Sequence, residues 1–236
     1  MTAIDERLRH LDWKAIEGSL WEHGCAKTPP ILTAEECAGL VALYRDEGRF
    51  RSRVDMAQHR FGLGEYKYFA DPLPAVVQAL RTGVYPYLAP VASRFMEALG
   101  SRERFPKDLG TFLRRCARSG QRKPTPLLLR YEAGGYNCLH QDLYGEVVFP
   151  FQLTCLLSRC GADFEGGEFL LVEQRPRAQS RGEAISTEQG EVVIFATAER
   201  PVRGARGYFR AGMRHGVSRV LSGSRYTLGI IFHDAR

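Results

Sequence analysis

Short apolar runs separated by glycine-containing segments fill the second half of the chain. The runs are rich in leucine, β-branched and aromatic residues, which favour strands, and they span residues 127–131, 151–157, 168–172, 191–195 and 226–232. Strands this short and this closely spaced are typical of a β-sandwich or jelly roll. We therefore expect a jelly-roll core over residues 127–236.

The first half of the chain has the apolar spacing of helices. Thr33 and Glu36 form a capping box ahead of an apolar run that ends at Leu43. Prolines 86 and 90 predict a break in one of the other helices, because proline interrupts the main-chain hydrogen bonds of a helix. These other helices are expected near residues 13–20, 74–99 and 106–116. We predict that residues 1–126 support one sheet of the jelly roll, giving one integrated α+β domain.

The composition is that of a folded protein without a membrane-spanning segment. Of the 236 residues, 44% are hydrophobic and 25% are charged. No apolar stretch approaches the roughly 20 residues that a membrane helix needs, and the N-terminus is too charged for a signal peptide. The six cysteines include no Cys-x-x-Cys pair, so we expect reduced, mostly buried thiols. These features predict a soluble cytoplasmic protein.

The net charge of +6 is unevenly distributed. Residues 102–123 hold eight basic and two acidic side chains, and residues 200–219 hold six arginines and no acidic side chain. Such segments attract polyanions, which favours a nucleic-acid partner. Arginine outnumbers lysine 28 to 5, however, so a merely solvated arginine-rich surface is the alternative.

A possible metal site lies in the strand-rich half. His140 and Asp142 are two residues apart, so in an extended segment both side chains point to the same face, and His215 follows 75 residues later. Two imidazoles and one carboxylate leave three positions of an octahedral ion open, which is the arrangement of non-haem Fe(II) oxygenases. With six histidines and nine aspartates, about 0.2 such His-x-Asp triplets are expected by chance, so the triplet alone is weak evidence.

Two further residues strengthen the metal-site hypothesis. Arg225 lies ten residues beyond His215, and Thr227 shares its strand face. A guanidinium offers paired donors to a carboxylate, and a hydroxyl two residues away can add a hydrogen bond. A dicarboxylic co-substrate would therefore fit between the metal and Arg225.

Together these motifs resemble the Fe(II)- and 2-oxoglutarate-dependent oxygenases, whose core is a double-stranded β-helix, over residues 127–234. The stretch from Arg130 to Asp142 is particularly similar to the AlkB group of nucleic-acid demethylases, because Tyr131 stands nine residues before His140. The chain also resembles a little-studied bacterial family of predicted oxygenases proposed to act on damaged DNA. The residues that carry the resemblance are Tyr131, His140-Gln141-Asp142, Gly166-Gly167-Glu168-Phe169, Gln189-Gly190-Glu191, His215-Gly216-Val217 and Arg225-Tyr226-Thr227.

The chain departs from the AlkB pattern at two positions. Leu129 stands where that group usually has asparagine, and Ile231 stands where it has a second arginine. The ten-residue interval between His215 and Arg225 is closer to that of prolyl-hydroxylase-like members. The resemblance therefore implies the oxygenase class and leaves the substrate open.

The resemblance implies a set of cofactors and roles. Fe(II) would be held by His140, Asp142 and His215, and 2-oxoglutarate and O2 would bind beside it. Arg225, Tyr131 and Thr227 would hold the distal carboxylate of 2-oxoglutarate. Oxidation of an N-methyl base would release formaldehyde and the repaired base. The alternatives are a hydroxylase of a protein side chain or small molecule and a non-catalytic β-sandwich binding module.

Residues 49–69 are the candidate substrate lid. Glycines and interleaved aromatics predict a hairpin or loop here. The alternative is a hairpin whose aromatics pack into the core, and the arginines of residues 203–214 are expected on a loop at the mouth of the site. In the lid, basic side chains would contact phosphates and aromatic side chains would stack on a base; the candidates are Arg51, Arg53, His59, Tyr66 and Tyr68.

Other residues that carry possible ligand groups are weaker candidates. His10, His23 and His233 have no partner at ligand spacing and are assigned to the surface or the core. Glu168 follows two glycines without an adjacent histidine, so we do not expect it to bind iron. Cys138 is expected to share the strand face of His140.

Overall fold

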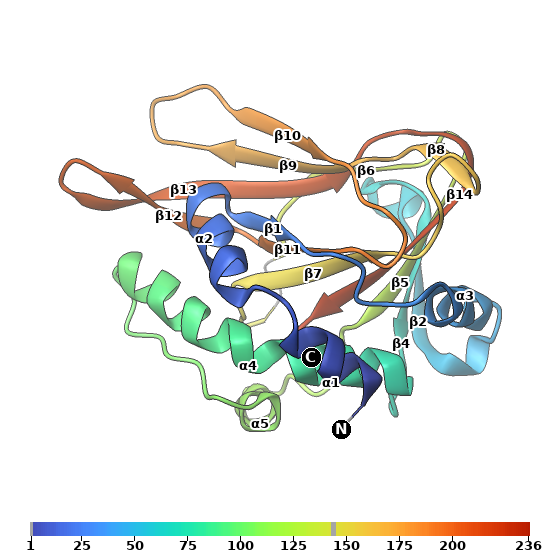
Figure 1. Cartoon of the computed structure of the whole chain (residues 1–236), viewed down its shortest axis with the longest axis horizontal. Helices are drawn as coiled ribbons and strands as arrows, with labels where there is room; N and C mark the ends of the chain where they lie inside the picture. The colour runs from blue at the N-terminus through green and yellow to red at the C-terminus, as the bar shows by residue number, and fades with distance from the viewer. Residues whose placement is uncertain (1, 143–144) are drawn as a thin grey trace.

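The computed structural model describes residues 2–142 and 145–236 (Figure 1). Helices precede most of the strands in chain order, and two short 3-10 turns, η1 (Glu47–Arg49) and η2 (Ala57–His59), flank β2. The helices are α1 (Ala3–Arg9), α2 (Trp13–His23), α3 (Ala34–Leu43), α4 (Ala75–Ala98) and α5 (Leu109–Arg118). The strands are β1 (Cys25–Lys27), β2 (Phe50–Asp55), β3 (Gly62–Leu63), β4 (Glu65–Phe69), β5 (Leu127–Glu132), β6 (Tyr136–His140), β7 (Phe151–Leu156), β8 (Phe164–Gly166), β9 (Phe169–Gln174), β10 (Arg181–Ile185), β11 (Val192–Ala196), β12 (Glu199–Gly204), β13 (Gly207–Val217) and β14 (Val220–Ile231).

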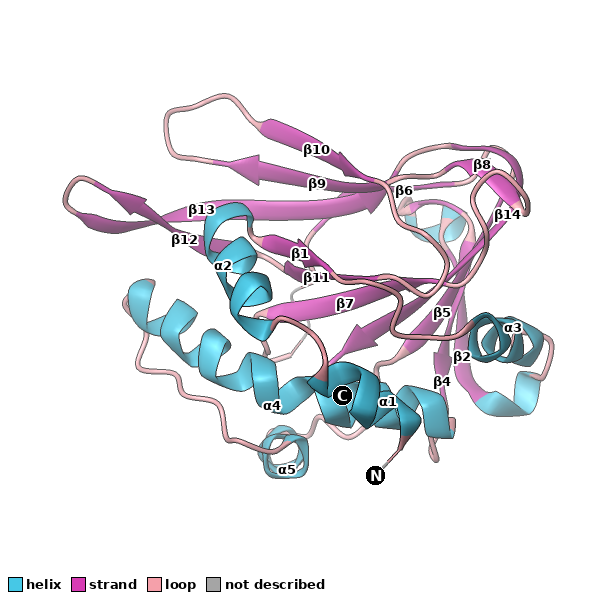
Figure 2. Ribbon diagram, in the orientation of Figure 1, coloured by secondary structure: helices cyan, strands magenta, loops and turns pink. Residues whose placement is uncertain are grey.

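Within the described residues, the strands form two antiparallel sheets (Figure 2). The major sheet has the order β1-β11-β7-β14-β5-β4-β2, and β8 pairs with β14. The minor sheet has the order β10-β9-β13-β6-β3, and β12 pairs with β13. The predicted α+β jelly roll, or double-stranded β-helix, is therefore confirmed.

The first half of the chain contributes strands to both sheets. β2 and β4 pair as a hairpin at the edge of the major sheet, and β4 continues the sheet by pairing with β5. β3 lies between them in the chain but pairs with β6 of the minor sheet. Residues 49–69 therefore cross from one sheet to the other and back.

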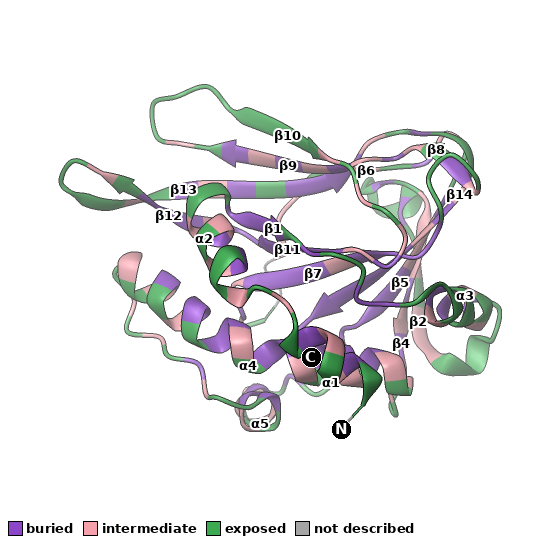
Figure 3. Cartoon of the chain, viewed as in Figure 1, coloured by how far each residue is buried: buried purple, intermediate pink, exposed green. Residues whose placement is uncertain are grey.

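The outer face of the major sheet is covered by α2 and α4, and α1 packs on α4 (Figure 1). Buried positions recur along the inward side of α4 and along β7 and β11 (Figure 3), and the side chains of these elements belong to one core. Every residue of β11 is buried, which explains its uninterrupted apolar sequence. The main core is therefore the layer between the helices and the major sheet.

Two expectations about local structure are wrong. α4 runs without a break through Pro86 and Pro90, because its buried face, which includes Tyr85 and Phe95, holds the helix against the major sheet. Residues 203–214 lie mostly on the hairpin of β12 and β13, where a loop was expected. This segment is rich in arginine and glycine, so strand propensity alone did not indicate its pairing.

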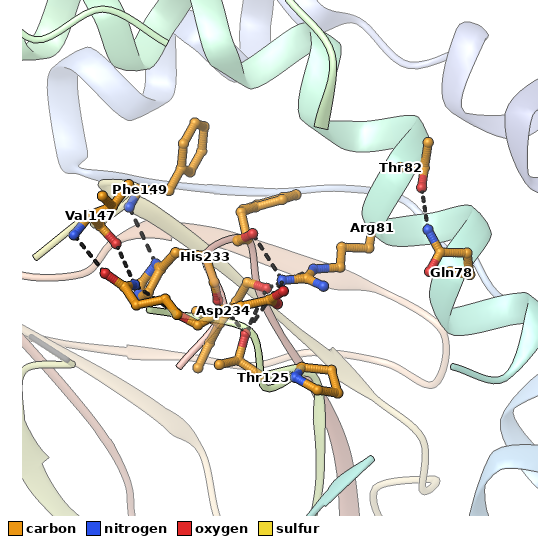
Figure 4. Close-up of polar contacts among 12 residues, drawn as sticks. Gln78, Arg81, Thr82, Thr125, Val147, Phe149, His233 and Asp234 are labelled. Atoms are coloured by element: carbon orange, nitrogen blue, oxygen red, sulfur yellow. Dashed lines mark hydrogen bonds and ion pairs between the residues drawn. The ribbon is translucent and has the colours of Figure 1, made fainter. Parts of the chain in front are cut away.

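The C-terminus is fixed to α4 by a buried arginine (Figure 4). The guanidinium of Arg81 donates hydrogen bonds to the carbonyls of Ile231 and Phe232 at 3.0 and 2.9 Å and pairs with Asp234 at 2.8 Å. Nearby, the backbone N–H of Phe149 donates to Nδ1 of buried His233 at 3.2 Å. These contacts connect β14 to α4 and to the segment that follows β6.

The cysteines agree with the expectation of reduced, mostly buried thiols. The six cysteines form no disulfide in the structure, and four of them, Cys25, Cys37, Cys116 and Cys155, are buried. Across residues 2–142 and 145–236, no helix combines the length and the apolarity that crossing a membrane requires.

The burial of His233 leads to a pH-dependent prediction. Burial first, and the charge of Arg81 second, lower the pKa of His233 from 6.5 to about 4. The folded protein therefore disfavours the protonated ring, so stability is complete above pH 6.5 and is lost as the pH falls toward 4. Between pH 7 and pH 5, we expect the free energy of unfolding to fall by about 2 kcal/mol more in the wild type than in His233→Gln. Urea unfolding at both pH values measures this difference, and equal pH dependence would contradict the prediction.

Candidate metal centre

The structure brings the predicted metal ligands together at one end of β6. His140 is the last residue of β6, Asp142 follows two residues later, and His215 of β13 is the cross-strand partner of His140. Nε2 of His140 lies 3.5 Å from Oδ1 of Asp142, and Nε2 of His215 lies 3.4 Å from Oδ2. All three ligand atoms lie within 4.8 Å of one another, which places them around a single point suitable for a metal ion.

Gln141 holds the turn between the two ligands of this segment. Its side chain points away from the metal centre, and its Nε2 donates to the carbonyls of Ala198 and Met213 at 2.7 and 2.9 Å. These carbonyls belong to the β11–β12 connection and to β13. The turn that carries His140 and Asp142 is therefore tied to the strand that carries His215.

The protonation of His140 and Asp142 suits a divalent metal. Nδ1 of His140 lies 2.8 Å from the carbonyl of Cys138, so an Nδ1–H donates there and leaves Nε2 free to bind metal. Burial, together with the neighbouring His215, lowers the pKa of His140 and favours the neutral ring. Burial opposes the charge on Asp142, but the hydrogen bond and charge of His215 lower its pKa overall. Two imidazoles and one carboxylate are a donor set that fits Fe(II).

Aromatic side chains surround the buried side of the centre. The ring centroid of His215 lies 4.6 Å from that of Phe195 and 6.1 Å from that of Phe169. His215 is buried, while His140 is partly exposed. The centre is therefore shielded from the core side and accessible from the other.

The candidate co-substrate residues lie on two paired strands of the major sheet. Arg225 of β14 is the cross-strand partner of Tyr131 of β5, and Thr227 follows on the same strand face. The guanidinium carbon of Arg225 lies 5.8 Å from the ring centroid of Tyr131 and equally far from that of Phe164. The structure therefore brings Arg225 and Tyr131 together beside the metal centre.

Arg225 is a buried cation with unused donors. Its Nε and Nη1 have no hydrogen-bond partner among residues 2–142 and 145–236, although the residue is only 2% exposed. Burial lowers its pKa to about 10, with Tyr131 and Glu168 opposing, so it stays charged at neutral pH. A buried charge with free donors is costly unless an anion pairs with it, and a carboxylate fits this requirement.

A cavity of about 290 Å³ connects the metal centre to these residues. Tyr131 and Thr227 line it together with the three metal-ligand candidates, whereas Arg225, the cross-strand partner of Tyr131, is not a lining residue. Tyr66 and Tyr68 of the predicted lid also line the cavity. The remaining lining residues are Arg60, Phe61, Leu127, Leu129, Asn137, Cys138, Leu139, Gln152, Leu153, Thr154, Phe169, Phe195, Gly216, Val217, Gly229 and Ile231.

The other predicted substrate residues do not line the cavity. Arg53 is the cross-strand partner of Lys67, whose side chain reaches Tyr44 beneath α3, and Arg53 itself pairs with Glu65. It therefore lies on the sheet face opposite to Tyr66 and Tyr68, because side chains alternate along a strand.

Arg51 and His59 lie close to the cavity without entering it. The guanidinium of Arg51 lies 4.5 Å from the ring centroid of Tyr68, and its Nε donates to the carbonyl of Pro124 at 2.8 Å. The ring of His59 is stacked on Phe61 at 5.3 Å. Sequence reasoning missed Phe61 as a cavity residue because nothing in the pattern of residues 49–69 separates it from aromatics that pack in the core.

The two basic segments do not form a shared basic surface at the site. Residues 102–123 include α5, which lies on the side of α4 away from the sheets (Figure 1). In the second segment, Arg200 is buried and donates to the carbonyl of Trp21 at 2.9 Å, and Arg210 pairs with Glu199 at 2.9 Å. Among the residues that line the cavity, the basic side chain other than histidine is Arg60.

The three other histidines named as weaker candidates do not belong to the metal centre. His10 and His23 are exposed, and His233 is buried at the C-terminal anchor. The backbone N–H of Glu168 donates to Oγ of Ser218 at 2.9 Å, and the hydroxyl of Ser218 donates to its carboxylate. Cys138 lines the cavity two residues before His140.

Comparison with solved structures identifies the class of protein that this fold defines. A prolyl-4-hydroxylase from Pseudomonas putida is similar with a TM-score of 0.56 and 14% identity, covering 95% of this chain and 99% of that one. An oxidoreductase of the 2OG-Fe(II) oxygenase family from Burkholderia pseudomallei gives a TM-score of 0.57 and 16% identity, covering 94% and 92%. The fold is that of the Fe(II)- and 2-oxoglutarate-dependent dioxygenases.

Sequence comparison gives the family. Residues 64–235 match the model of the Oxygenase-NA family, described as an oxygenase catalysing oxidative methylation of damaged DNA. Two uncharacterized proteins of Mycobacterium tuberculosis, from strains CDC 1551 and H37Rv, are each 48% identical over 167 residues, covering 71% of this chain and 72% of theirs. The chain belongs to the Oxygenase-NA family and is a dioxygenase.

The ligand geometry predicts one Fe(II) per chain. We expect His140→Ala and His215→Ala each to weaken Fe(II) binding at least about tenfold, because each removes one of three ligands. Anaerobic titration calorimetry measures the affinity, and His23→Ala, which removes an exposed histidine, is the matched control. Full-strength binding by both ligand variants would contradict the assignment.

Proposed function

We propose that this dioxygenase removes methyl groups from alkylated bases of nucleic acid in the cytoplasm. The observation that carries the proposal is the cavity that joins a His-Asp-His centre to aromatic walls, beside a buried arginine with unused donors. The description of the family, which names damaged DNA, supports the choice of substrate.

Different residues around the cavity would bind the metal and the co-substrate. His140, Asp142 and His215 would hold Fe(II), and Arg225 with Tyr131 and Thr227 would hold the distal carboxylate of 2-oxoglutarate. With O2, the bound metal and co-substrate would supply oxidation of a nearby C–H bond, and oxidation of an N-methyl group releases formaldehyde. Phe169 and Phe195 would keep water from the core side of the centre.

Aromatic walls favour a planar substrate group. Tyr66 and Tyr68 lie on adjacent inward-facing positions of β4, and their ring centroids are 5.4 Å apart in an edge-to-face arrangement. Base–aromatic stacking tolerates any base sequence because every base has a π face. Because an enzyme that acts on a base cannot reach its target atom inside a duplex, the target base would be extruded or would belong to a single strand.

Hydroxylation of a protein side chain or small molecule is the second candidate. The observation that favours it is the similarity of the fold to prolyl hydroxylases, which include the Pseudomonas putida protein and one from Trichoplax adhaerens with a TM-score of 0.57 and 14% identity. The ten-residue interval between His215 and Arg225 is also closer to that of prolyl-hydroxylase-like members than to that of the AlkB group. The two candidates share the metal centre and differ in the substrate.

The role of Arg225 can be tested through the co-substrate. We expect Arg225→Ala to retain Fe(II) and to raise the 2-oxoglutarate concentration needed for half-maximal succinate formation by about 30-fold or more, because the co-substrate carboxylate loses a charge-assisted partner. Arg219→Ala, which removes an exposed arginine near the start of the same strand, should behave like the wild type. An unchanged 2-oxoglutarate requirement in Arg225→Ala would remove this residue from the site.

The substrate class can be tested by product analysis. Iron-loaded protein is incubated with 2-oxoglutarate, O2 and methylated single- and double-stranded oligonucleotides, with unmethylated oligonucleotides of the same sequence as controls. We expect formaldehyde and succinate in equal amounts with at least one methylated base. Succinate without formaldehyde on every oligonucleotide would contradict the demethylase proposal and favour the second candidate.

A further inference from the structure

Three consecutive residues, His59, Arg60 and Phe61, stand at the edge of the cavity between η2 and β3; we call them the rim segment. Arg60 and Phe61 line the same cavity as His140, Asp142 and His215. Phe61 is 41% exposed, although a phenylalanine in a hairpin normally packs inward. Its position at the mouth of the cavity, and not in the core, requires an explanation.

Phe61 belongs to an exposed apolar patch. The patch is contiguous because β3 pairs with β6, with Gly62 opposite Asn137, and because the N–H of Cys138 donates to the carbonyl of Phe61 at 2.8 Å. The same strand, β6, ends at His140. The patch therefore lies directly beside the metal centre. Its members are Phe61, Leu63, Tyr136 and Leu139, each between 37% and 47% exposed.

The backbone of the rim segment is set by positive φ angles. Arg60 has φ 60°, in the left-handed region that a non-glycine residue seldom adopts, and Gly62 and Gly64 have φ 136° and 148°. A Cβ on Gly62 would lie 2.3 Å from the carbonyl oxygen of Tyr136, and a Cβ on Gly64 would lie 2.8 Å from the ring of Tyr131. These close approaches tie the segment to β6 and to the co-substrate wall.

Backbone hydrogen bonds to the buried residue Met56 also hold the rim segment in place. The N–H of Phe61 donates to the carbonyl of Met56 at 3.0 Å, and the N–H of Met56 donates to the carbonyl of Gly64 at 3.0 Å. Met56 is fully buried. These hydrogen bonds fix the rim segment on folding, so a ligand would not have to order it on binding. Strained backbone that the surrounding structure holds in place is typical of ligand-binding positions.

The rim segment carries a cation without a carboxylate partner. Arg60 is exposed and forms no ion pair within the described residues, whereas Arg53 pairs with Glu65 and Arg130 pairs with Glu132. The two residues that flank Arg60 in the chain, His59 and Phe61, have stacked rings. A free guanidinium next to stacked rings complements a phosphate next to a base.

We propose that the rim segment is the docking site for a single nucleic-acid strand, in which Phe61 stacks on a base adjacent to the target and Arg60 binds the neighbouring phosphate. The inference rests on the demethylase function proposed above and specifies its substrate as single-stranded. A side chain that stacks on a base needs that base unpaired and unstacked, which a duplex does not offer without deformation.

Substitutions at Phe61 distinguish stacking from simple apolar contact. Fluorescence anisotropy measures binding of a methylated single-stranded oligonucleotide to the iron-loaded protein. We expect Phe61→Ala and Phe61→Leu to weaken binding about 5- to 100-fold, and Phe61→Trp to retain it, because only an aromatic ring stacks on a base. Leu221→Ala is the matched control, since Leu221 is a 64% exposed side chain outside the patch. Full affinity in Phe61→Leu would identify an apolar peptide-type surface and overturn the inference.

Substitution of Arg60 tests the phosphate contact. Asparagine tolerates the left-handed conformation, so Arg60→Asn removes the charge without forcing the backbone to change. We expect the slope of log affinity against log salt to become shallower by about 0.7 for the single strand. Arg206→Ala, at the tip of the β12–β13 hairpin, should leave the slope unchanged. An unchanged slope in Arg60→Asn would overturn the phosphate contact.

The two proposals can fail separately. If the wild type releases formaldehyde from a methylated oligonucleotide but the Phe61 and Arg60 variants bind like the wild type, the rim inference is wrong and the demethylase function stands. If the wild type prefers a duplex over the single strand of the same sequence, the single-strand assignment is wrong. If no oligonucleotide binds, the rim inference fails, and the formaldehyde assay decides the demethylase function independently.

Discussion

The cross-strand pairing of β6 with β13 is the constraint on which the site depends. It sets His140 directly opposite His215, and the turn after β6 then brings Asp142 within reach of both rings. A shift of one residue in this register would turn one histidine to the other face of the minor sheet. The two hydrogen bonds from Gln141 oppose such a shift, because they attach the turn to the β11–β12 connection and to β13.

The second half of the site comes from the other sheet. Arg225, Thr227 and Tyr131 lie on β14 and β5 of the major sheet, whereas the metal ligands lie on or next to the minor sheet. The separation of Arg225 from the three metal-ligand candidates therefore depends on the packing of two sheets. This arrangement explains how a chain can keep a buried arginine without a partner among its described residues: the surrounding fold holds its position, and an anionic ligand would satisfy it.

Sequence patterns were least informative where contacts with other strands or helices, and not the intrinsic propensities of the residues, determine the secondary structure. β13 is rich in arginine and glycine, yet it forms a long strand because β9, β6 and β12 all pair with it. α4 contains two prolines, yet its buried face keeps it continuous. Strand alternation likewise separated Arg53 from Tyr66 and Tyr68, which a list of basic and aromatic residues in one segment could not do.

The residues themselves determined the class of this protein, because the ligand types, the two-residue spacing of His140 and Asp142, and the following arginine all belong to one chemistry. The jelly roll followed from the spacing of short apolar runs. Only the tertiary structure decided which side chains of residues 49–69 reach the cavity, since this segment crosses between the sheets and places Tyr66 and Tyr68 within it, Arg53 outside it, and Phe61 at its rim. The physical reason is that periodicity determines faces within one strand, whereas the approach of two sheets depends on contacts between residues far apart in the chain.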